Sequence, residues 1–325
     1  MSSLRFLSLA LIVLAAASTA AAADTSPARH WPSIAPAQRV ASVAGAPLLA
    51  VARAGKRVVA VGDHGLVLLS DAGKAFRQAK AVPVRSMLTT VQFLDERQGF
   101  AAGHDGVVLR TDDGGETWAL LRSTPGAEQP ILSLHFDSWE HGIAVGLYGW
   151  AIETRDAGRT WTELPIGSGE DADRHLMHVF ASPRGTLFIA AEAGAIFRSA
   201  DKGRTWQALS TGNKGSLWYG SALRDGTLLL CGMRGHLYRS RDDGQTWQAV
   251  QSHTVQSLTG IAQLADGRVT VVGMGGTVLN SSNDGKDFTL AQREGQEPLT
   301  AVLDDGSRPP VLVSMAGPVA AQARH

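Results

Sequence analysis

The stretch TDDGGETW at residues 111–118 places two acids, two glycines and a tryptophan within one short segment. Such a segment can belong to a calcium loop, a catalytic carboxylate pair or a structural turn. Close copies follow as TRDAGRTW (154–161), SADKGRTW (199–206) and SRDDGQTW (240–247), which share the pattern Ser/Thr-x-Asp-x-Gly-x-x-Trp. Two weaker copies, LSDAGKAF (69–76) and SSNDGKDF (281–288), flank them. A segment that recurs at such intervals indicates a repeat architecture.

A second element precedes each copy, usually a pair of glycines three residues apart in an apolar run, as in VGDHGLV and AGHDGVV. The later glycines of these elements lie 41 to 45 residues apart: Gly65, Gly106, Gly149, Gly194, Gly235, Gly276 and Gly317. Between them, β-branched or alternating runs separated by turn residues read as four short strands per unit. Four strands repeated seven times predict an all-β, seven-bladed β-propeller with four-stranded antiparallel blades.

The last repeat reaches His325 without a fourth strand. Near the other end of the chain, RHWPSI around Trp31 resembles RTWQAL around Trp206. We therefore expect the N-terminal strand to complete the last blade, which would remove two exposed sheet edges.

In a propeller the repeated box falls at the turn between the third and outermost strands of a blade. A short carboxylate can accept hydrogen bonds from the backbone N–H groups of that turn, and the glycine tolerates a positive φ. A calcium loop would need further ligand positions and a terminal bidentate glutamate, which the boxes lack. We expect structural rather than metal-binding roles for the acid position of each box: Asp71, Asp113, Asp156, Asp201, Asp242 and Asn283.

The first residues, MSSLRFLSLALIVLAAASTAAAADT, resemble a secretory signal peptide with cleavage after Ala23. The expected domains are a signal peptide at residues 1–23 and a monomeric propeller at residues 24–325, located in the periplasm. No later run is long and apolar enough to be read as a membrane span. Equal numbers of basic and acidic residues argue against nucleic-acid binding. The single cysteine, Cys231, lies in an apolar strand and is expected to be buried.

The Asp boxes, the VG-x-x-G turns, the sevenfold period and the export signal together resemble the photosystem II stability and assembly factor family. The similarity extends over the whole expected propeller and includes non-photosynthetic bacterial relatives, among which we place this chain. The resemblance implies a non-catalytic protein without a cofactor that helps a membrane or envelope complex to assemble. In some bacteria that complex could be a transporter.

Sialidases also contain Asp boxes, so a glycoside hydrolase or glycan-binding propeller is the alternative. A sialidase requires an arginine triad and a nucleophilic tyrosine with an acidic partner. This chain offers only Tyr148, Tyr219 and Tyr238, and no arginine is followed by Ile-Pro. We therefore predict a protein that binds an envelope or membrane-complex subunit and catalyses no reaction.

The binding surface is expected on the face opposite the boxes, where the turns between second and third strands meet the loops that enter each inner strand. Aromatic, arginine and histidine side chains at these positions have the composition of an interface core. Trp150 and Trp218 could instead pack between blades. His64 and His104, with Asp63 and Asp105, could form a zinc site, although no short His-x-x-x-His spacing supports it. The candidate partner-binding residues are His64, Arg85, His104, Tyr148, Trp150, Arg174, His175, Trp218, Tyr219, Arg234 and His236.

Overall fold

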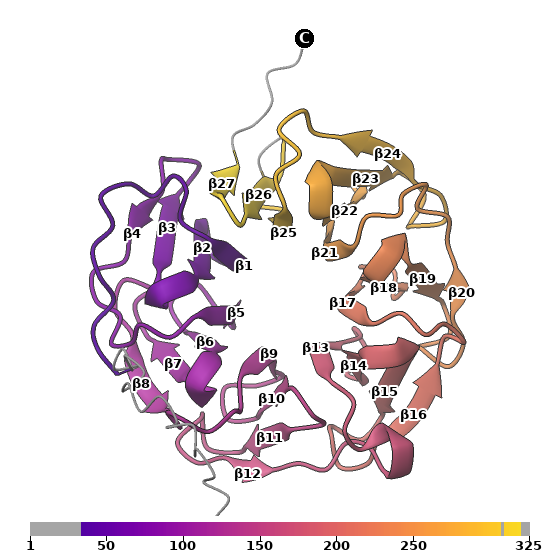
Figure 1. Cartoon of the computed structure of the whole chain (residues 1–325), viewed down its shortest axis with the longest axis horizontal. Helices are drawn as coiled ribbons and strands as arrows, with labels where there is room; N and C mark the ends of the chain where they lie inside the picture. The colour runs from indigo at the N-terminus through magenta and orange to yellow at the C-terminus, as the bar shows by residue number, and fades with distance from the viewer. Residues whose placement is uncertain (1–33, 307–308, 320–325) are drawn as a thin grey trace, which may run out of the picture. The chain divides into compact units, whose positions relative to one another are not determined.

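The computed structural model describes residues 34–306 and 309–319. Residues Pro32–His325 form one compact unit. In the described residues of this unit, six antiparallel sheets have four strands and a seventh has three, and each sheet follows the chain order of its strands. The sheets are arranged around a central axis, with their innermost strands toward it (Figure 1). The prediction of a seven-bladed propeller with four-stranded antiparallel blades is confirmed.

Each blade runs from an innermost to an outermost strand. Blade one comprises β1 (Leu48–Ala54), β2 (Arg57–Gly62), β3 (Val67–Asp71) and β4 (Arg77–Gln78). Blade two comprises β5 (Leu88–Phe93), β6 (Gly99–Gly103), β7 (Val108–Thr111) and β8 (Ala119–Arg122). Blade three comprises β9 (Ile131–Phe136), β10 (Gly142–Gly146), β11 (Ala151–Thr154) and β12 (Thr162–Glu163). Blade four comprises β13 (Leu176–Ala181), β14 (Leu187–Ala191), β15 (Ala195–Ser199) and β16 (Gln207–Ser210).

The remaining blades follow the same pattern. Blade five comprises β17 (Leu217–Ala222), β18 (Leu228–Gly232), β19 (Leu237–Ser240) and β20 (Gln248–Ala249). Blade six comprises β21 (Leu258–Gln263), β22 (Val269–Gly273), β23 (Thr277–Ser281) and β24 (Thr289–Gln292). Blade seven comprises β25 (Leu299–Leu303), β26 (Val311–Ser314) and β27 (Gly317–Val319). Single 3-10 turns are η1 (Asp63–Gly65), η2 (His104–Gly106), η3 (Gly169–Asp171), η4 (Glu192–Gly194), η5 (Met233–Gly235) and η6 (Met274–Gly276).

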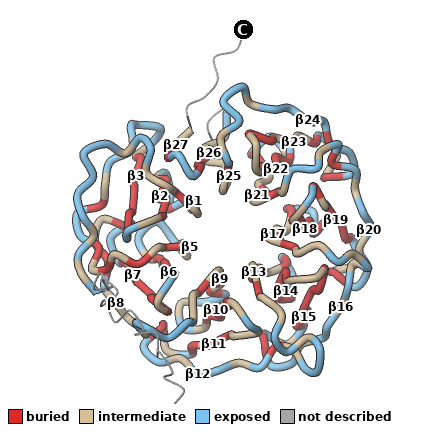
Figure 2. Tube along the Cα trace, in the orientation of Figure 1, coloured by how far each residue is buried: buried red, intermediate tan, exposed pale blue. Residues whose placement is uncertain are grey.

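The second strands are buried on both faces, which explains why they read as continuous apolar runs such as LLLCG in β18. Cys231 in this strand is fully buried, as the sequence predicted. Burial is concentrated on the middle strands, whereas the outer strands are largely exposed (Figure 2). The hydrophobic core is divided among the interfaces between neighbouring blades. Among the described residues there is one apolar cluster for each of the seven interfaces.

The ring is closed by contacts between blades seven and one. Val313 of β26 packs in one apolar cluster with Leu48 and Leu68 of blade one. The Thr300 hydroxyl donates a hydrogen bond of 2.7 Å to the Leu48 carbonyl, and the Gly45 N–H donates one of 2.9 Å to the Ala316 carbonyl.

The expected N-terminal strand around Trp31 lies outside the described residues, and closure of the last blade by it stays a prediction. The segment that follows it contacts the loop between blades one and two. The Ala37 N–H donates to the Val82 carbonyl at 2.9 Å, and the Arg85 guanidinium donates to the Pro36 carbonyl at 3.0 Å.

The glycine pairs have two separate steric functions. A Cβ on the first glycine, at Gly62 or Gly103, would lie about 2 Å from the carbonyl oxygen of the residue that precedes the neighbouring innermost strand. The second glycine has a positive φ, for example +70° at Gly65. These glycines therefore allow the second strand to turn tightly against the entry to the blade.

The two rims of the propeller have different loops. On one rim, the turns between second and third strands contact the loops that enter the next blade, as in the 3.0 Å bond from Gly65 N–H to the Ser86 carbonyl. We call this rim the turn face. On the other rim, the box turns contact the loops between first and second strands, as in the 2.8 Å bond from Gly114 N–H to the Arg97 carbonyl. We call it the box face, and this arrangement confirms the predicted separation of boxes and turns.

Candidate functional site

The acid of each well-formed box is occupied by its own turn. In the box of blade two, the Asp113 carboxylate accepts hydrogen bonds from the Thr117 N–H (2.9 Å), the Thr117 hydroxyl (2.6 Å) and the Thr111 hydroxyl (2.9 Å). Asp156, Asp201 and Asp242 make the same three contacts in the next three blades. Hydrogen bonds from Thr205, its hydroxyl first, lower the pKa of Asp201 to about 2.

Two boxes depart from the pattern and differ in structure. Asp71, whose box lacks the leading hydroxyl, forms ion pairs with Arg57 and Arg77 at 2.5 and 3.1 Å. Asn283 keeps the turn bonds, because its amide oxygen accepts the Asp287 N–H at 3.1 Å and its amide nitrogen donates to the Asp287 carboxylate at 2.9 Å.

The box of one blade is also held by an arginine of the preceding blade. Arg57 donates to the Gly114 carbonyl at 3.0 Å. Arg198 and Arg239 donate in the same way, each at 2.9 Å, to the carbonyls of Asp243 and Asp284. Charged groups of the box face are therefore used within the propeller itself.

On the turn face, the middle residue of most turns is left-handed although it is not glycine. His64, Asp105, Tyr148, Ala193 and Arg234 have φ between 54° and 57°. This conformation costs an L-residue roughly 1–2 kcal/mol, and blade six avoids that cost with Gly275. The box turns hold the same conformation at Ala157, Lys202, Asp243 and Asp284, so it belongs to the tight turns of both faces.

The candidates on blades one and two do not form a shared cluster. His64 is exposed and its imidazole lies 3.0 Å from the Asp63 carboxylate. The Asp105 carboxylate accepts a 2.7 Å bond from the Ser86 hydroxyl, and His104 is exposed. In the described part of the chain, no group of three or more His, Cys, Asp or Glu side chains is placed to hold a metal ion.

The candidates between blades three and four are partly brought together. Tyr148 is 64% exposed, its ring lies edge-on to His175 at 4.7 Å, and its N–H donates to the His175 imidazole at 3.0 Å. Arg174 is paired with Asp171 at 2.5 Å. Trp150 packs in the core between blades two and three and against the Arg122 guanidinium, 5.3 Å away. Trp150 therefore packs between blades, which was the alternative to a partner-binding role.

Trp218 and Tyr219 line the central channel, a cavity of about 460 Å³ bounded by all seven innermost strands. The second residue of each of these strands lies at a β-bulge, and each lines the channel at the end nearest the turn face. Bulges redirect side chains and are common near functional sites. The seven bulge residues are Leu49, Thr89, Leu132, Met177, Trp218, Thr259 and Thr300.

The bulge residues divide into two kinds. Thr89, Thr259 and Thr300 each donate a hydrogen bond to the first carbonyl of the next innermost strand, at 2.6 to 2.8 Å. Blades three, four and five instead carry Leu132, Met177 and Trp218. We call these three residues the channel arc. The seventh bulge residue, Leu49 of blade one, lies between Thr300 and Thr89. The channel mouth is therefore apolar along blades three to five, and the other four blades carry three threonines and one leucine.

Below the arc, the His178 ring stacks on Tyr219 at 4.0 Å, and its Nδ1 accepts the Gly220 N–H at 3.3 Å. Burial lowers the pKa of His178 to about 3 and raises the pKa of Tyr219 to about 12. Both rings are therefore neutral near pH 7. The predicted binding residues did not include Leu132, Met177 or His178. Aligning the repeats on their second glycines places Leu132 and Met177 at the position of Trp218, and His178 at the position of Tyr219.

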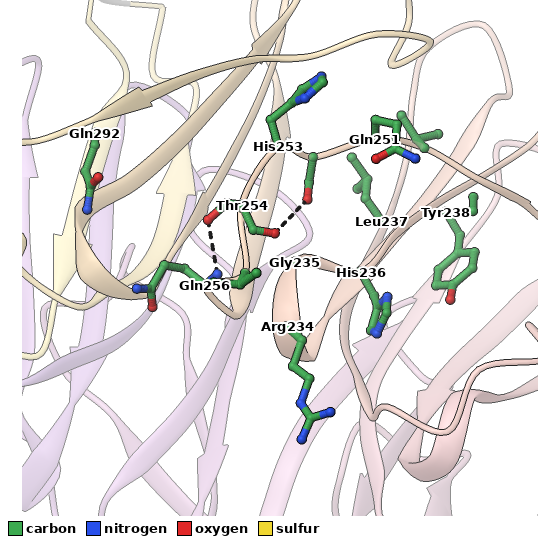
Figure 3. A pocket seen from close by; sticks show the side chains of 14 residues that line it. Arg234, Gly235, His236, Leu237, Tyr238, Gln251, His253, Thr254, Gln256 and Gln292 are labelled. Carbon is green, nitrogen blue, oxygen red and sulfur yellow. Dashed lines mark hydrogen bonds between the residues drawn. The ribbon is translucent and has the colours of Figure 1, made fainter.

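Arg234 and His236 line a third region, a cavity of about 600 Å³ between blades five and six. Figure 3 shows it with Gln251 and His253 from the loop after β20 and Gln292 from β24. The His236 ring lies 3.0 Å from the Asn213 amide nitrogen. We call this cavity the rim pocket. The eleven candidates thus fall into separate regions of the turn face and channel.

No helix of the described residues is long and apolar enough to span a membrane.

The family model described as Photosynthesis system II assembly factor YCF48 matches residues 116–297. The Photosystem II assembly lipoprotein Ycf48 of Prochlorococcus marinus (strain MIT 9312) is 39% identical over 127 residues, which are 39% of this chain and 37% of that protein. The match thus spans little more than a third of this relative. It is named a lipoprotein, whereas Cys231 of this chain is buried and unsuited to lipid attachment.

Three solved structures share the fold. YCF48 bound to D1 peptide has a TM-score of 0.68 at 16% identity, covering 84% of this chain and 92% of that chain. YCF48 from Cyanidioschyzon merolae has a TM-score of 0.66 at 16% identity, covering 87% and 97%. A streptogramin B lyase has a TM-score of 0.71 at 11% identity, covering 86% and 94%. One of the three is a lyase, so the fold alone does not assign a function. The family model, however, covers more than half of the 325 residues, and the chain belongs to the family of the photosystem II assembly factor YCF48.

Proposed function

We propose that this chain is a non-catalytic assembly factor that binds a peptide segment of a membrane-protein complex at the channel mouth on its turn face. The family membership supports an assembly role, and one solved relative is described as bound to D1 peptide. Photosystem II is the complex named for the family. A different envelope complex, including a transporter, stays our prediction for a non-photosynthetic relative.

The channel arc is the observation that carries the proposal. Three adjacent blades carry Leu132, Met177 and Trp218 at a position where three of the other four blades carry a threonine that ties neighbouring blades together. Each replacement gives up an inter-blade hydrogen bond, and all three side chains stay partly exposed in the channel. Large apolar side chains that remain exposed beside one another suit the anchor of a partner.

The box face, unlike the turn face, has its charged groups engaged within the propeller, and this also favours binding at the turn face. Its carboxylates are taken up by turn amides and hydroxyls, and its arginines hold the next blade. In the channel, His178 and Tyr219 are held in their neutral forms. These features favour binding over glycoside hydrolysis, which needs a titratable acid pair.

We further propose that the propeller is exported. Residues 1–23 would be a cleaved signal peptide, and the mature chain at residues 24–325 would be a periplasmic monomer. The relative named as a lipoprotein supports export. Residues 1–33 lie outside the described part of the chain, so this proposal rests on their sequence.

Restoring the repeat's own threonine provides the test. Trp218→Thr and Met177→Thr place a hydroxyl where Thr89, Thr259 and Thr300 make inter-blade bonds, so both variants should fold. Each should weaken capture of the membrane-complex subunit by about tenfold or more if the residue is an anchor, since anchors contribute at least about 1–2 kcal/mol. Leu49→Thr, at the same register position in blade one and outside the arc, is the matched control.

Capture would be measured by co-purification with tagged protein from solubilised membranes, with the captured subunit identified by mass spectrometry. A panel of sialosides and other glycosides would be assayed in parallel. Undiminished capture by both arc variants, or turnover of any glycoside, would overturn the proposal.

A further inference from the structure

The central channel is lined by neutral groups. No aspartate, glutamate, lysine or arginine is found among the described residues that line it. Its two histidines, His135 and His178, are neutral near pH 7 because burial lowers their pKa values to about 4 and about 3. An ion placed here would lose its hydration without gaining a counter-charge, which is costly. The cavity of about 460 Å³ therefore suits a neutral occupant.

Three polar groups that line the channel have no hydrogen-bond partner among the described residues. They are the indole N–H of Trp218, the hydroxyl of Tyr219 and one ring nitrogen of His178. Because the His178 Nδ1 accepts the Gly220 N–H, the proton of the neutral ring is on Nε2, which is free to donate. None of the three groups is among the fully buried polar atoms that lack a partner in the described chain. Each is therefore accessible to a molecule in the channel.

Trp218 also has an unoccupied aromatic face. The other tryptophans of the described chain each have a ring contact, an arginine over the ring or an indole hydrogen bond. Trp218 has none of these with the described residues, and its side chain is half-buried at the channel mouth. One position deeper, His178 and Tyr219 are stacked on each other at 4.0 Å. An aromatic ring in the channel can thus pack on Trp218 and direct a polar atom toward this pair.

The opposite side of the channel leaves room for such a ring. His178 and Tyr219 are the third residues of their innermost strands, and blades six, seven and one have Gly260, Ala301 and Ala50 at that position. At this level the channel is therefore aromatic and polar along blades four and five, and small and apolar along blades six, seven and one.

We propose that the channel binds a tyrosine side chain of the partner segment, with its ring on Trp218 and its hydroxyl between His178 and Tyr219. A phenol hydroxyl can accept from the His178 Nε2–H and donate to the Tyr219 hydroxyl, whereas an indole N–H only donates. The inference deepens the proposed function and rests on it, because it names the side chain that the channel arc anchors.

The test uses blocked pentapeptides, glycine–serine–X–serine–glycine, in which X is tyrosine, phenylalanine or glutamate. Binding to the whole propeller is measured by calorimetry and by NMR of the His178 imidazole signal. The tyrosine peptide should bind about tenfold more tightly than the phenylalanine peptide, which corresponds to about 1.4 kcal/mol. It should also shift the His178 signal. The glutamate peptide should not bind, because the channel offers no counter-ion.

Tyr219→Phe removes a hydroxyl that has no partner among the described residues. It should leave the melting temperature unchanged and remove the preference for tyrosine. Tyr238→Phe is the matched control, the same change in β19 of the same blade and outside the channel lining, and it should bind as the wild type does. Trp218→Leu keeps an apolar side chain but removes the indole face, and should weaken binding of the tyrosine and phenylalanine peptides by about fivefold.

Absence of binding by the tyrosine peptide, equal binding of the tyrosine and phenylalanine peptides, or an unaltered preference in Tyr219→Phe would overturn the inference. Binding of p-cresol without binding of the tyrosine peptide would assign the channel to a free small molecule. Displacement of the tyrosine peptide by methyl glucoside would assign it to a sugar. Either of these two results would also overturn the inference. Capture through the channel arc is measured separately, so the proposed function stands if only the preference for tyrosine fails.

Discussion

Replacing Asp113 by alanine tests whether the repeated box is a structural turn. The substitution removes the acceptor of the Thr117 N–H, the Thr117 hydroxyl and the Thr111 hydroxyl. Thr117 is exposed, so its groups can bond to water instead. Thr111 is 1% exposed, and its hydroxyl proton would lose its acceptor inside the protein. An unsatisfied buried group costs about 1–3 kcal/mol, and we expect a loss of about 2 kcal/mol in the free energy of unfolding.

Asp112→Ala is the matched control in the same turn. Its carboxylate is 57% exposed and pairs with Arg110 at the surface. Surface pairs contribute about 0–1 kcal/mol, so this variant should lose less than half as much. Urea unfolding of the wild type and both variants, monitored by tryptophan fluorescence, measures the difference. Equal losses in the two variants would refute the argument from the hydrogen bonds.

The pH dependence of the stability difference between the wild type and Asp113→Ala tests the same hydrogen bonds. Burial raises the pKa of Asp113, but hydrogen bonds from Thr117 and Thr111 outweigh it, and the pKa is lowered. A lowered carboxyl pKa stabilises the folded state above the unfolded pKa, about 3.9, and this stabilisation is lost as the pH falls through the folded pKa. The difference between wild type and Asp113→Ala should therefore shrink below about pH 4. Calcium should not change it, and a large calcium-dependent stabilisation lost in the variant would show a metal site.

Three further outcomes follow from the fold. Thr300→Val removes the bond to the Leu48 carbonyl that joins blades seven and one, and should cost about 1 kcal/mol in urea unfolding; no loss would mean that this bond does not stabilise the ring. Gly103→Ala places a Cβ 1.9 Å from the Met87 carbonyl oxygen and should yield little soluble protein. Gly126→Ala, whose Cβ would have no neighbour within 4 Å, should lower the free energy of unfolding by about 1 kcal/mol. Equal yields and stabilities of the two variants would contradict the steric argument. Because the folded pKa of His178 is about 3, below the unfolded value, protonation of its imidazole should destabilise the folded state as the pH falls from about 6.5 toward 3, with a contribution of about 2 kcal/mol at pH 5. Burial also lowers the pKa of His135, to about 4, so the wild type should lose more than this one contribution. His178→Gln should show a shallower slope, and an unchanged slope would contradict a neutral imidazole in the channel.

The fold could be predicted because its determinants are local and repeated. The first glycine of each pair is required by a carbonyl about 2 Å from where its Cβ would lie, and the box by amides within the same turn. Each signal occupies one short segment and recurs every 41 to 45 residues, so each copy supports the others. Asp71 shows the limit of this reasoning. Its box resembles the others, but without the leading hydroxyl its carboxylate pairs with Arg57 and Arg77.

The candidate site was less predictable because it depends on contacts between blades. The rule that turns and entry loops share a face predicted which loops lie together on the turn face, yet it did not separate Trp150, which packs beneath Arg122, from Tyr148, which is exposed. Whether a side chain next to a turn points inward depends on the register of the strand that follows. Met177 and His178 were missed since neither is unusual in its own strand, and only their neighbours across the channel give them significance.

Comparing equivalent positions of the seven blades shows which residues depart from the structural pattern of the repeat, which amino-acid composition alone does not show. In three blades the second residue of the innermost strand is a threonine whose hydroxyl donates a hydrogen bond to the next innermost strand, so its role there is structural. Leu49 also departs from threonine, but its neighbour across the next interface is Thr89, so it is isolated. Leu132, Met177 and Trp218 depart in three consecutive blades and increase in size toward blade five, where Arg234 and the rim pocket also lie. Packing within single blades does not explain such a contiguous departure. A partner that contacts neighbouring blades at once explains it, and blades three to five are therefore where we place the binding side of this propeller.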